Sequence, residues 1–372
     1  MSFDDWLAEQ AAKRRDAGLE RSLVSRAPDD DLVDLAGNDY LGLSRDSRVV
    51  AAASGAAHRW GAGAGASRLV TGTLGVHDQL EAALAVWVGT EAALVHSTGY
   101  HANLSAVTAL ADADTLIVSD AHVHASLVDA CRLARGRVQV VPHLGVAEVE
   151  EALSERTESR ALVITESIFS VLGDAAPLTE LADVCARHGA VLVVDEAHGL
   201  GVAGDGGRGL VNATGLAGRP DVVVTLTLSK ALGAQGGAVL ASQAVVDHLV
   251  NRARPFIYDT GLAPAAAGAA HAALDVITLE PALVQRVNTV ATALADTVGV
   301  DRPAGAVLSV PMPGPTEAVA AQAACAAEGI RVGCFRPPSV PDGISRLRLT
   351  ASAGISDLDL ARACDVLKTV LP

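Results

Sequence analysis

Two charged residues in this chain follow apolar runs, at places where they could take part in chemistry. In VLVVDEAHGLG, Asp195 ends one apolar run and His198 stands three residues later. In DVVVTLTLSKALGAQGG, Lys230 follows a second run, with Thr227 and Ser229 just before it. Taken singly, such an aspartate is typical of a helix cap and such a lysine of a solvated loop. An amine and a carboxylate that meet at one site have a joint use, so the pair carries more information than either residue.

The pair matches the two groups that pyridoxal phosphate requires from a protein. A lysine amine holds the cofactor aldehyde as an imine, and a carboxylate keeps the pyridine nitrogen protonated. The protonated ring can then withdraw electrons from a bound amino acid. We therefore predict that Lys230 holds pyridoxal phosphate and that Asp195 pairs with its ring nitrogen.

These side chains need strands to position them, and the chain offers a series of strand-like runs. Compact runs rich in Val, Ile and Leu alternate with helical stretches: AALVH (92–96), TLIVS (115–119), VQVV (138–141), ALVITE (161–166), VLVVD (191–195), VVVTL (222–226) and GAVL (237–240). Unbroken apolar strands between helices indicate a doubly wound, mostly parallel α/β sheet that is covered on both faces. Ligands bind at the carboxyl ends of such strands, where Asp195, Ser119, Glu166 and the TLSK segment stand.

The pattern changes near residue 265. A long Ala-rich helix is followed by the short runs AVLSV and RLRLT and by a terminal helix from about 356 to 370. This pattern favours a second, smaller α+β domain. We predict an N-terminal arm over 1–45, a large cofactor-binding domain over 46–264 and a small C-terminal domain over 265–372.

Composition excludes several classes of function. A net charge of -15 without long runs of Lys or Arg disfavours binding to nucleic acid or to anionic membranes. The five cysteines form no CxxC pair, which favours reduced thiols in a cytoplasm and predicts no metal site. The N-terminal residues lack the apolar core of a signal peptide, and the other apolar runs are too short to cross a bilayer. We expect a soluble cytoplasmic protein.

A longer set of motifs resembles the α-oxoamine synthases, which are fold-type I pyridoxal-phosphate transferases. The motifs occur in the order of that family: AGNDYLGLS, GAGASRLVTGTLGVHDQLE, STGYHAN, SDAHVHASLVDACR, ESIFSVLGDAAPL, DEAHGLGV, TLSKALGAQGG and RLRLT. The resemblance covers roughly residues 5–370. It implies the fold predicted above and a homodimer with its active sites at the subunit interface.

The resemblance also implies roles for individual residues around the cofactor. His124 stacks on the pyridine ring, while His198 and Ser170 lie near the phenolic oxygen. The phosphate is held by the amides of Gly99 and Tyr100 at a helix start, with the hydroxyl of Thr227 nearby. Thr260, in YDTGLAP, matches a residue that the family supplies from the neighbouring subunit.

Substrate contacts follow from the same match. Arg348 in RLRLT, helped by Asn38, binds the amino-acid carboxylate, because a guanidinium can donate two parallel hydrogen bonds to it. Ser339 in RPPSVP and Arg21 match contacts to the acyl substrate. Within the family the chain is most similar to the biotin-pathway members, which condense L-alanine with a pimeloyl thioester and release CO2 and the free thiol. Lys230, His124, Asp195 and His198 are then the catalytic residues.

Three other functions remain open at this point. The nearest keeps the cofactor and changes the substrates, as in glycine C-acetyltransferases, 5-aminolevulinate synthases and serine palmitoyltransferases. A binding or regulatory protein with the same fold would be expected to lack Lys230 or Asp195, and both are present. A nicotinamide-dependent oxidoreductase would need a glycine fingerprint after a strand, whereas GAGAG at 61–65 follows a helical stretch.

Overall fold

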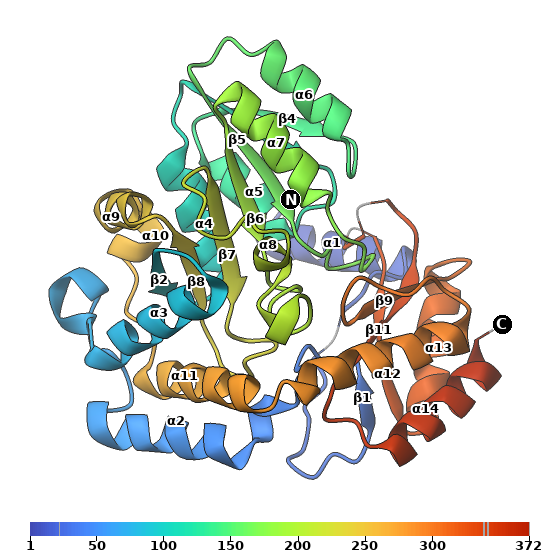
Figure 1. Cartoon of the computed structure of the whole chain (residues 1–372). Helices are drawn as coiled ribbons and strands as arrows, with labels where there is room; N and C mark the ends of the chain where they lie inside the picture. Colours follow the sequence, from blue (N-terminus) through green and yellow to red (C-terminus); the bar gives the residue numbers. More distant parts are fainter. Residues whose placement is uncertain (22, 338, 341, 372) are drawn as a thin grey trace.

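The computed structural model describes residues 1–21, 23–337, 339–340 and 342–371. The strands in this part of the chain form two sheets, one of seven strands and one of four. In Figure 1 the larger sheet lies in the body of the molecule, and the smaller one lies beside it among the C-terminal helices.

The larger sheet has the strand order β2-β8-β7-β6-β5-β3-β4. Its strands are β2 (Ala92–His96), β3 (Thr115–Asp120), β4 (Arg137–Val141), β5 (Arg160–Glu166), β6 (Val191–Asp195), β7 (Val222–Thr227) and β8 (Gly237–Ala241). Each of the seven apolar runs in the sequence forms one of them. Strands β4, β3, β5, β6 and β7 are parallel, and β8 is antiparallel to both of its neighbours. The predicted mostly parallel sheet is therefore confirmed.

Helices cover this sheet, which explains why its strands are apolar without alternation. Every residue of β3 and of β7 is buried, whereas the edge strand β4 is mostly exposed. The surrounding helices are α2 (Ser47–Trp60), α3 (Gly75–Val88), α4 (Gly99–Leu110), α5 (Ala125–Leu133), α6 (Val146–Ser154), α7 (Leu178–His188), α8 (Leu210–Ala213), α9 (Gln243–Arg252), α10 (Arg254–Ile257) and α11 (Pro264–Leu279). The short turn η1 (Leu43–Arg45) precedes α2, η2 (Arg68–Gly72) lies between α2 and α3, and η3 (Asp205–Gly207) precedes α8.

Helix α11 packs closely against α2 through small residues, and the two lie side by side along one edge of the molecule (Figure 1). A Cβ atom added at Gly268 would stand 2.7 Å from the Cβ of Ala56 and 3.1 Å from the carbonyl oxygen of Ala52. Only a glycine lets the two helix backbones approach this closely. This contact between small side chains is in keeping with an aromatic content of only 3%.

The smaller sheet has the strand order β1-β10-β11-β9. Its strands are β1 (Val33–Leu35), β9 (Val307–Pro311), β10 (Ile330–Phe335) and β11 (Arg346–Thr350), and its helices are α12 (Ala282–Val298), α13 (Pro315–Ala327) and α14 (Asp357–Val370). Strand β1 comes from the segment predicted as an arm and pairs in parallel with β10. Helix α1 (Phe3–Asp16) precedes it and has no buried residue. The domain boundaries at 46 and 265 stay a prediction.

A histidine after β4 ties the end of β3 to the loop after β5. His143 Nδ1 lies 3.0 Å from Asp120 Oδ1, and His143 Nε2 lies 2.8 Å from Asp174 Oδ2. Its ring stacks on His122 at a centroid distance of 4.0 Å and meets Phe169 edge-on. Because Phe169 adjoins Ser170, this cluster fixes a loop that borders the predicted site.

No single helix in the described ranges is long and apolar enough to span a membrane. Helices α11 and α12 meet that criterion only as a pair, and the pair bends by 84°.

Candidate active site

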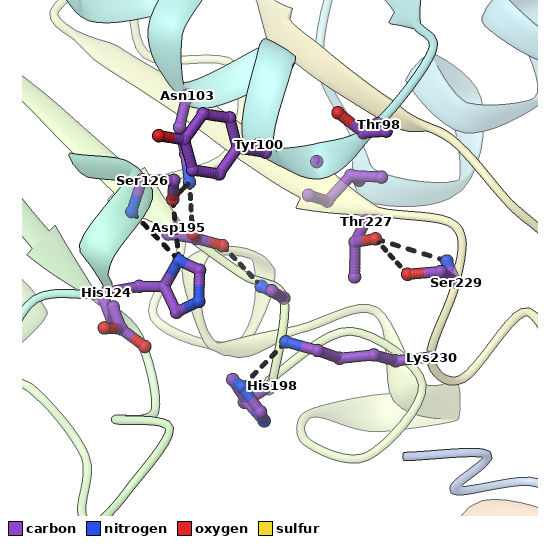
Figure 2. A pocket seen from close by; sticks show the side chains of 14 residues that line it. Thr98, Tyr100, Asn103, His124, Ser126, Asp195, His198, Thr227, Ser229 and Lys230 are labelled. Atoms are coloured by element: carbon purple, nitrogen blue, oxygen red, sulfur yellow. Dashed lines mark hydrogen bonds between the residues drawn. The ribbon is translucent and has the colours of Figure 1, made fainter. Parts of the chain in front are cut away.

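A cavity of about 260 Å³ opens at the carboxyl ends of β5, β6 and β7 (Figure 2). The start of α4, the start of α5 and the segment after β7 complete its walls. The cavity is lined by Thr98, Gly99, Tyr100, Asn103, His124, Ser126, Glu166, Asp195, Ala197, His198, Leu226, Thr227, Ser229 and Lys230. Most of the predicted cofactor residues are therefore brought together in one place.

Asp195 ends β6 and is almost fully buried, with 5% of its surface exposed. Its Oδ2 accepts a hydrogen bond of 2.7 Å from Asn103 Nδ2, and its Oδ1 accepts one of 2.8 Å from the Ala197 N–H. Two N–H donors thus fix the orientation of this carboxylate, which lines the cavity.

Lys230 extends into the cavity from the segment after β7, and its Nζ lies 2.7 Å from His198 Nε2. Burial lowers the pKa of Lys230 to about 8, against the opposing effect of the negative charges of Asp195 and Glu166. Burial, and then the charge of Lys230, also lower the pKa of His198 well below its usual value. A neutral imidazole beside an amine of lowered pKa suits a lysine that must act as a nucleophile and a base.

His198 continues into a buried chain of hydrogen bonds. Its Nδ1 lies 2.6 Å from the hydroxyl of Tyr40, and that hydroxyl donates to Asn38 Oδ1 at 3.2 Å. Burial raises the pKa of Tyr40 to about 12, so the phenol stays neutral and keeps its proton for donation. Tyr40 stands within the quoted motif AGNDYLGLS, but the sequence assigned it no role.

Arg348 lies on β11, and 4% of its surface is exposed. Its Nη1 and Nη2 donate to Asn38 Oδ1 at 3.1 and 3.2 Å, and its Nε donates to the Ser170 carbonyl at 2.8 Å. No carboxylate in the described part of the chain pairs with this guanidinium. Arg348 and Asn38, predicted as one carboxylate site, are in contact.

Helix α4 supplies an anion site next to the lysine. Thr98 caps the helix by accepting from the His101 N–H at 3.0 Å, and Gly99 and Tyr100 follow in the first turn. Helical N–H groups in the first turn have no carbonyl partner within the helix and attract phosphate. A Cβ at Gly99 would stand 2.9 Å from the Cβ of Thr227, so glycine is needed where α4 meets the end of β7.

Glu166 lines the cavity, and the only prediction made for it from the sequence is its place at a strand end. It pairs in register with Asp195 and has 1% of its surface exposed. Burial, and then the charge of Asp195, raise the pKa of Glu166 well above its usual value. Its Oε2 accepts from the Ser170 N–H at 3.2 Å, which places Ser170 beside the cavity.

Two predicted acyl contacts also meet, although neither lines this cavity. Arg21 Nη2 donates to Ser339 Oγ at 2.6 Å across the N-terminal segment and the small domain. Thr260 forms a bridge with Ser67 and is likewise absent from the cavity walls of its own chain. Its assignment to the partner's site stays a prediction.

Comparison with known proteins identifies a matching family, relatives that are similar in sequence, and solved structures with a similar fold. The model of the family Aminotransferase class I and II matches residues 30–367. The 8-amino-7-oxononanoate synthase of Mycolicibacterium gilvum is 59% identical over 98% of this chain and 97% of its own length. The enzyme of the same name from Mycolicibacterium smegmatis is 56% identical over 98% and 96%.

Among solved structures, serine palmitoyltransferase from S. paucimobilis with a bound pyridoxal phosphate–myriocin adduct has a TM-score of 0.91 and 28% identity, covering 98% of this chain and 96% of that one. The serine palmitoyltransferase of Sphingomonas wittichii has a TM-score of 0.90 and 29% identity, covering 99% and 96%. An 8-amino-7-oxononanoate synthase from Francisella tularensis has a TM-score of 0.78, covering 92% and 98%; at 24% identity this likeness concerns the fold alone.

Proposed function

Because the chain belongs to the aminotransferase class I and II family, and within it to the 8-amino-7-oxononanoate synthases, we propose that it condenses L-alanine with a pimeloyl thioester in biotin biosynthesis. A carbon–carbon bond forms between the α-carbon of alanine and the thioester carbonyl carbon. The α-carbon of alanine gives up its proton, and the thiol leaves in its protonated form. The carboxylate of alanine then leaves as CO2, and a proton takes its place on the α-carbon. The product is 8-amino-7-oxononanoate. The cavity that joins Lys230 to Asp195 is the observation that carries this proposal.

The cofactor is pyridoxal phosphate, and the residues of the cavity fit it. Lys230 would hold its aldehyde, and Asp195 would face its ring nitrogen. The first turn of α4 and Thr227 would hold its phosphate, and His124 would cover its ring. When bound, the cofactor supplies an electron sink that stabilises negative charge on the carbon next to the amino group.

Lys230 has a second use as the base of the reaction. We assign to its Nζ the removal of the α-proton of alanine, since an amine with a pKa of about 8 is partly unprotonated near neutral pH. His198 Nε2, at 2.7 Å, accepts a hydrogen bond from that amine and orients it. The neighbouring Tyr40 keeps His198 in place.

Arg348 and Asn38 select for an amino acid. The buried guanidinium is held by Asn38 Oδ1 and by the carbonyl of Ser170, and it can donate further hydrogen bonds to a carboxylate. Its Cζ also lies over the ring of Phe335, 5.4 Å from the centroid, which keeps its plane fixed. Alanine, glycine and serine share the carboxylate that this group recognises.

The acyl chain therefore decides the substrate. We place the distal carboxylate of the pimeloyl group near Arg21 and Ser339, which already contact each other at 2.6 Å. A long, purely apolar acyl chain would offer these two donors no acceptor, so it gains nothing from them, whereas a distal carboxylate does. The relatives at 56 to 59% identity support this choice over the serine palmitoyltransferases at 28 to 29%.

We also propose a homodimer in which Thr260 reaches the partner's cofactor site, in line with the exposed Tyr258 two residues before it. A cytoplasmic location agrees with the cysteines, all of which are free thiols in the described chain. The described residues hold no cluster of three metal-ligating side chains.

Product analysis tests the proposal directly. The holoenzyme is incubated with alanine, glycine or serine and with pimeloyl-, acetyl-, succinyl- or palmitoyl-CoA, and the products are identified by mass. We expect the fastest turnover for alanine with pimeloyl-CoA. A faster product from another pair would overturn the substrate assignment and leave the fold and the cofactor standing.

A further inference from the structure

Asn103 lies on α4 and lines the cavity, and 3% of its surface is exposed. Its side-chain amide has a partner on each side. Nδ2 donates to Asp195 Oδ2 at 2.7 Å and to Ser126 Oγ at 2.8 Å (Figure 2). On the other side, Oδ1 accepts from Thr225 Oγ1 at 2.5 Å. A carboxylate can only accept, so the amide group cannot be turned round. Asn103 therefore has one fixed orientation.

Ser126 connects Asn103 to His124 by hydrogen bonds. Both the backbone N–H of Ser126, at 3.2 Å, and its Oγ, at 2.7 Å, lie against His124 Nδ1 (Figure 2). A backbone N–H is always a donor, so Nδ1 must carry a lone pair. Because Ser126 Oγ accepts from Asn103, its own proton is free to point at Nδ1 as well. Two donors at Nδ1 leave the ring proton on Nε2.

The ring of His124 is neutral in this arrangement. Burial lowers the pKa of His124, ahead of the opposing effect of the charge of Asp195. The residue lines the cavity, and Nε2 has no hydrogen-bond partner within the described chain. Nε2 is thus a free N–H donor on a residue that lines the cavity.

We propose that Asn103 is a positioning residue that sets two catalytic groups at once. It holds the carboxylate of Asp195 with one N–H, and with the other it fixes, through Ser126, the His124 tautomer whose proton is on Nε2. Donation from Nε2 to an oxygen of the acyl substrate rests on the proposed function. The tautomer itself does not depend on it.

Thr225 completes the network from a neighbouring strand. The register of β6 and β7 pairs Asp195 with Thr225, so the threonine hydroxyl reaches the amide that holds the aspartate. Replacing Thr225 by Val removes the donor that anchors Asn103 Oδ1 and keeps the size of the side chain. Replacing it by Ser keeps the hydroxyl and should preserve the network.

The test reads the tautomer without substrate or cofactor. Protein labelled with 15N in its histidines is studied by two-bond 1H–15N correlation, and His124 is assigned from its absence in His124→Gln. In the wild type we expect an unprotonated Nδ1 and a protonated Nε2. Asn103→Ala should give a mixture of tautomers and a higher His124 pKa, with Thr225→Val intermediate and Thr225→Ser close to wild type.

Ser105→Ala is the matched control, because Ser105 is fully buried on the same helix and its Oγ has no partner in the described chain. It should leave the His124 signals unchanged. In steady-state assays Asn103→Ala should lower kcat roughly tenfold to a hundredfold, with a much smaller change in KM for alanine.

Two results would overturn the proposal: a wild-type His124 with its proton on Nδ1, or an Asn103→Ala protein whose His124 signals match the wild type. The second would mean that Asn103 only stabilises the fold. If Asn103→Ala does not fold, Thr225→Val decides the question by the same readout. A wrong substrate assignment would show in the product analysis and would leave the His124 signals as predicted.

Discussion

The His143 cluster should make the stability of the protein depend on pH in the alkaline range. Burial disfavours the charged ring, but hydrogen bonds to Asp120 and Asp174 outweigh it and raise the pKa of His143 to about 9 from 6.5. The stacked His122 responds in the opposite sense, since burial and then the charge of His143 lower its pKa. His143 is thus the member of this cluster that carries positive charge near neutral pH.

The sign and the size of this pH effect on the unfolding free energy follow from the pKa shift of His143. A group with a raised pKa in the folded state contributes its full stability below the unfolded value of 6.5, and loses it as pH rises through about 9. At about 1.4 kcal/mol per pKa unit, the upper limit is about 3 kcal/mol. The wild type should therefore lose up to that amount of unfolding free energy between pH 6.5 and pH 9.5. His143→Gln keeps a donor but has no charge, so it should not show this loss.

Urea unfolding of the holoenzyme at fixed protein and cofactor concentration measures the difference at several pH values. His58→Gln is the control, because His58 is exposed and forms no ion pair in the described chain. Equal pH dependence of the wild type and His143→Gln would refute the reasoning. So would a gap between the two that widens with rising pH.

Three further predictions concern the catalytic groups. Borohydride should attach the cofactor to Lys230 and not to Lys13 or Lys368, and peptide mapping would show the labelled residue. Label on another lysine would refute the assignment. The Lys230→Ala protein should fold but show no turnover. Asp195→Asn should lower kcat by about a hundredfold or more, and its unfolding free energy by about 1 to 3 kcal/mol, because both carboxylate oxygens accept from N–H groups and an amide has one acceptor. Retention of kcat within a few-fold would contradict that role. Arg348→Ala should raise KM for alanine roughly tenfold to a hundredfold, since it removes a charge-assisted pair. An unchanged KM would move the carboxylate site elsewhere, with Arg336 the next candidate.

The strands, and the positions of Asp195 and Lys230 at one cavity, could be predicted from the sequence for a physical reason. A strand buried on both faces must be apolar along its whole length, so the first polar residue after it marks the strand end. Asp195 and Lys230 stand at such positions, and their chemistry restricts the cofactor. The family motifs then supplied His124, His198 and Arg348.

The hydrogen-bond partners of these side chains could not be predicted from the sequence in the same way. Asn103 contacts Asp195 and Thr225, which lie far along the chain, because helix α4 packs under β7 and the strand register pairs the other two. Tyr40 reaches His198 for a similar reason. The pairing of β1 with β10 also joins distant segments, so the predicted N-terminal arm gave no sign of it. Such contacts depend on packing, which the local pattern of one sequence does not specify.

The close crossing of α11 and α2 has a consequence for how this protein can change over generations. Gly268 has no side chain to shorten where it meets Ala56, and any enlargement there must push two backbones apart. Overpacking of this kind costs about 1 to 3 kcal/mol. A saturation library at both positions, sorted by residual activity after heating, should retain almost only glycine at 268 and almost nothing larger than alanine at 56. At this helix crossing, substitutions that enlarge a side chain should therefore be excluded more strictly than substitutions that shorten one.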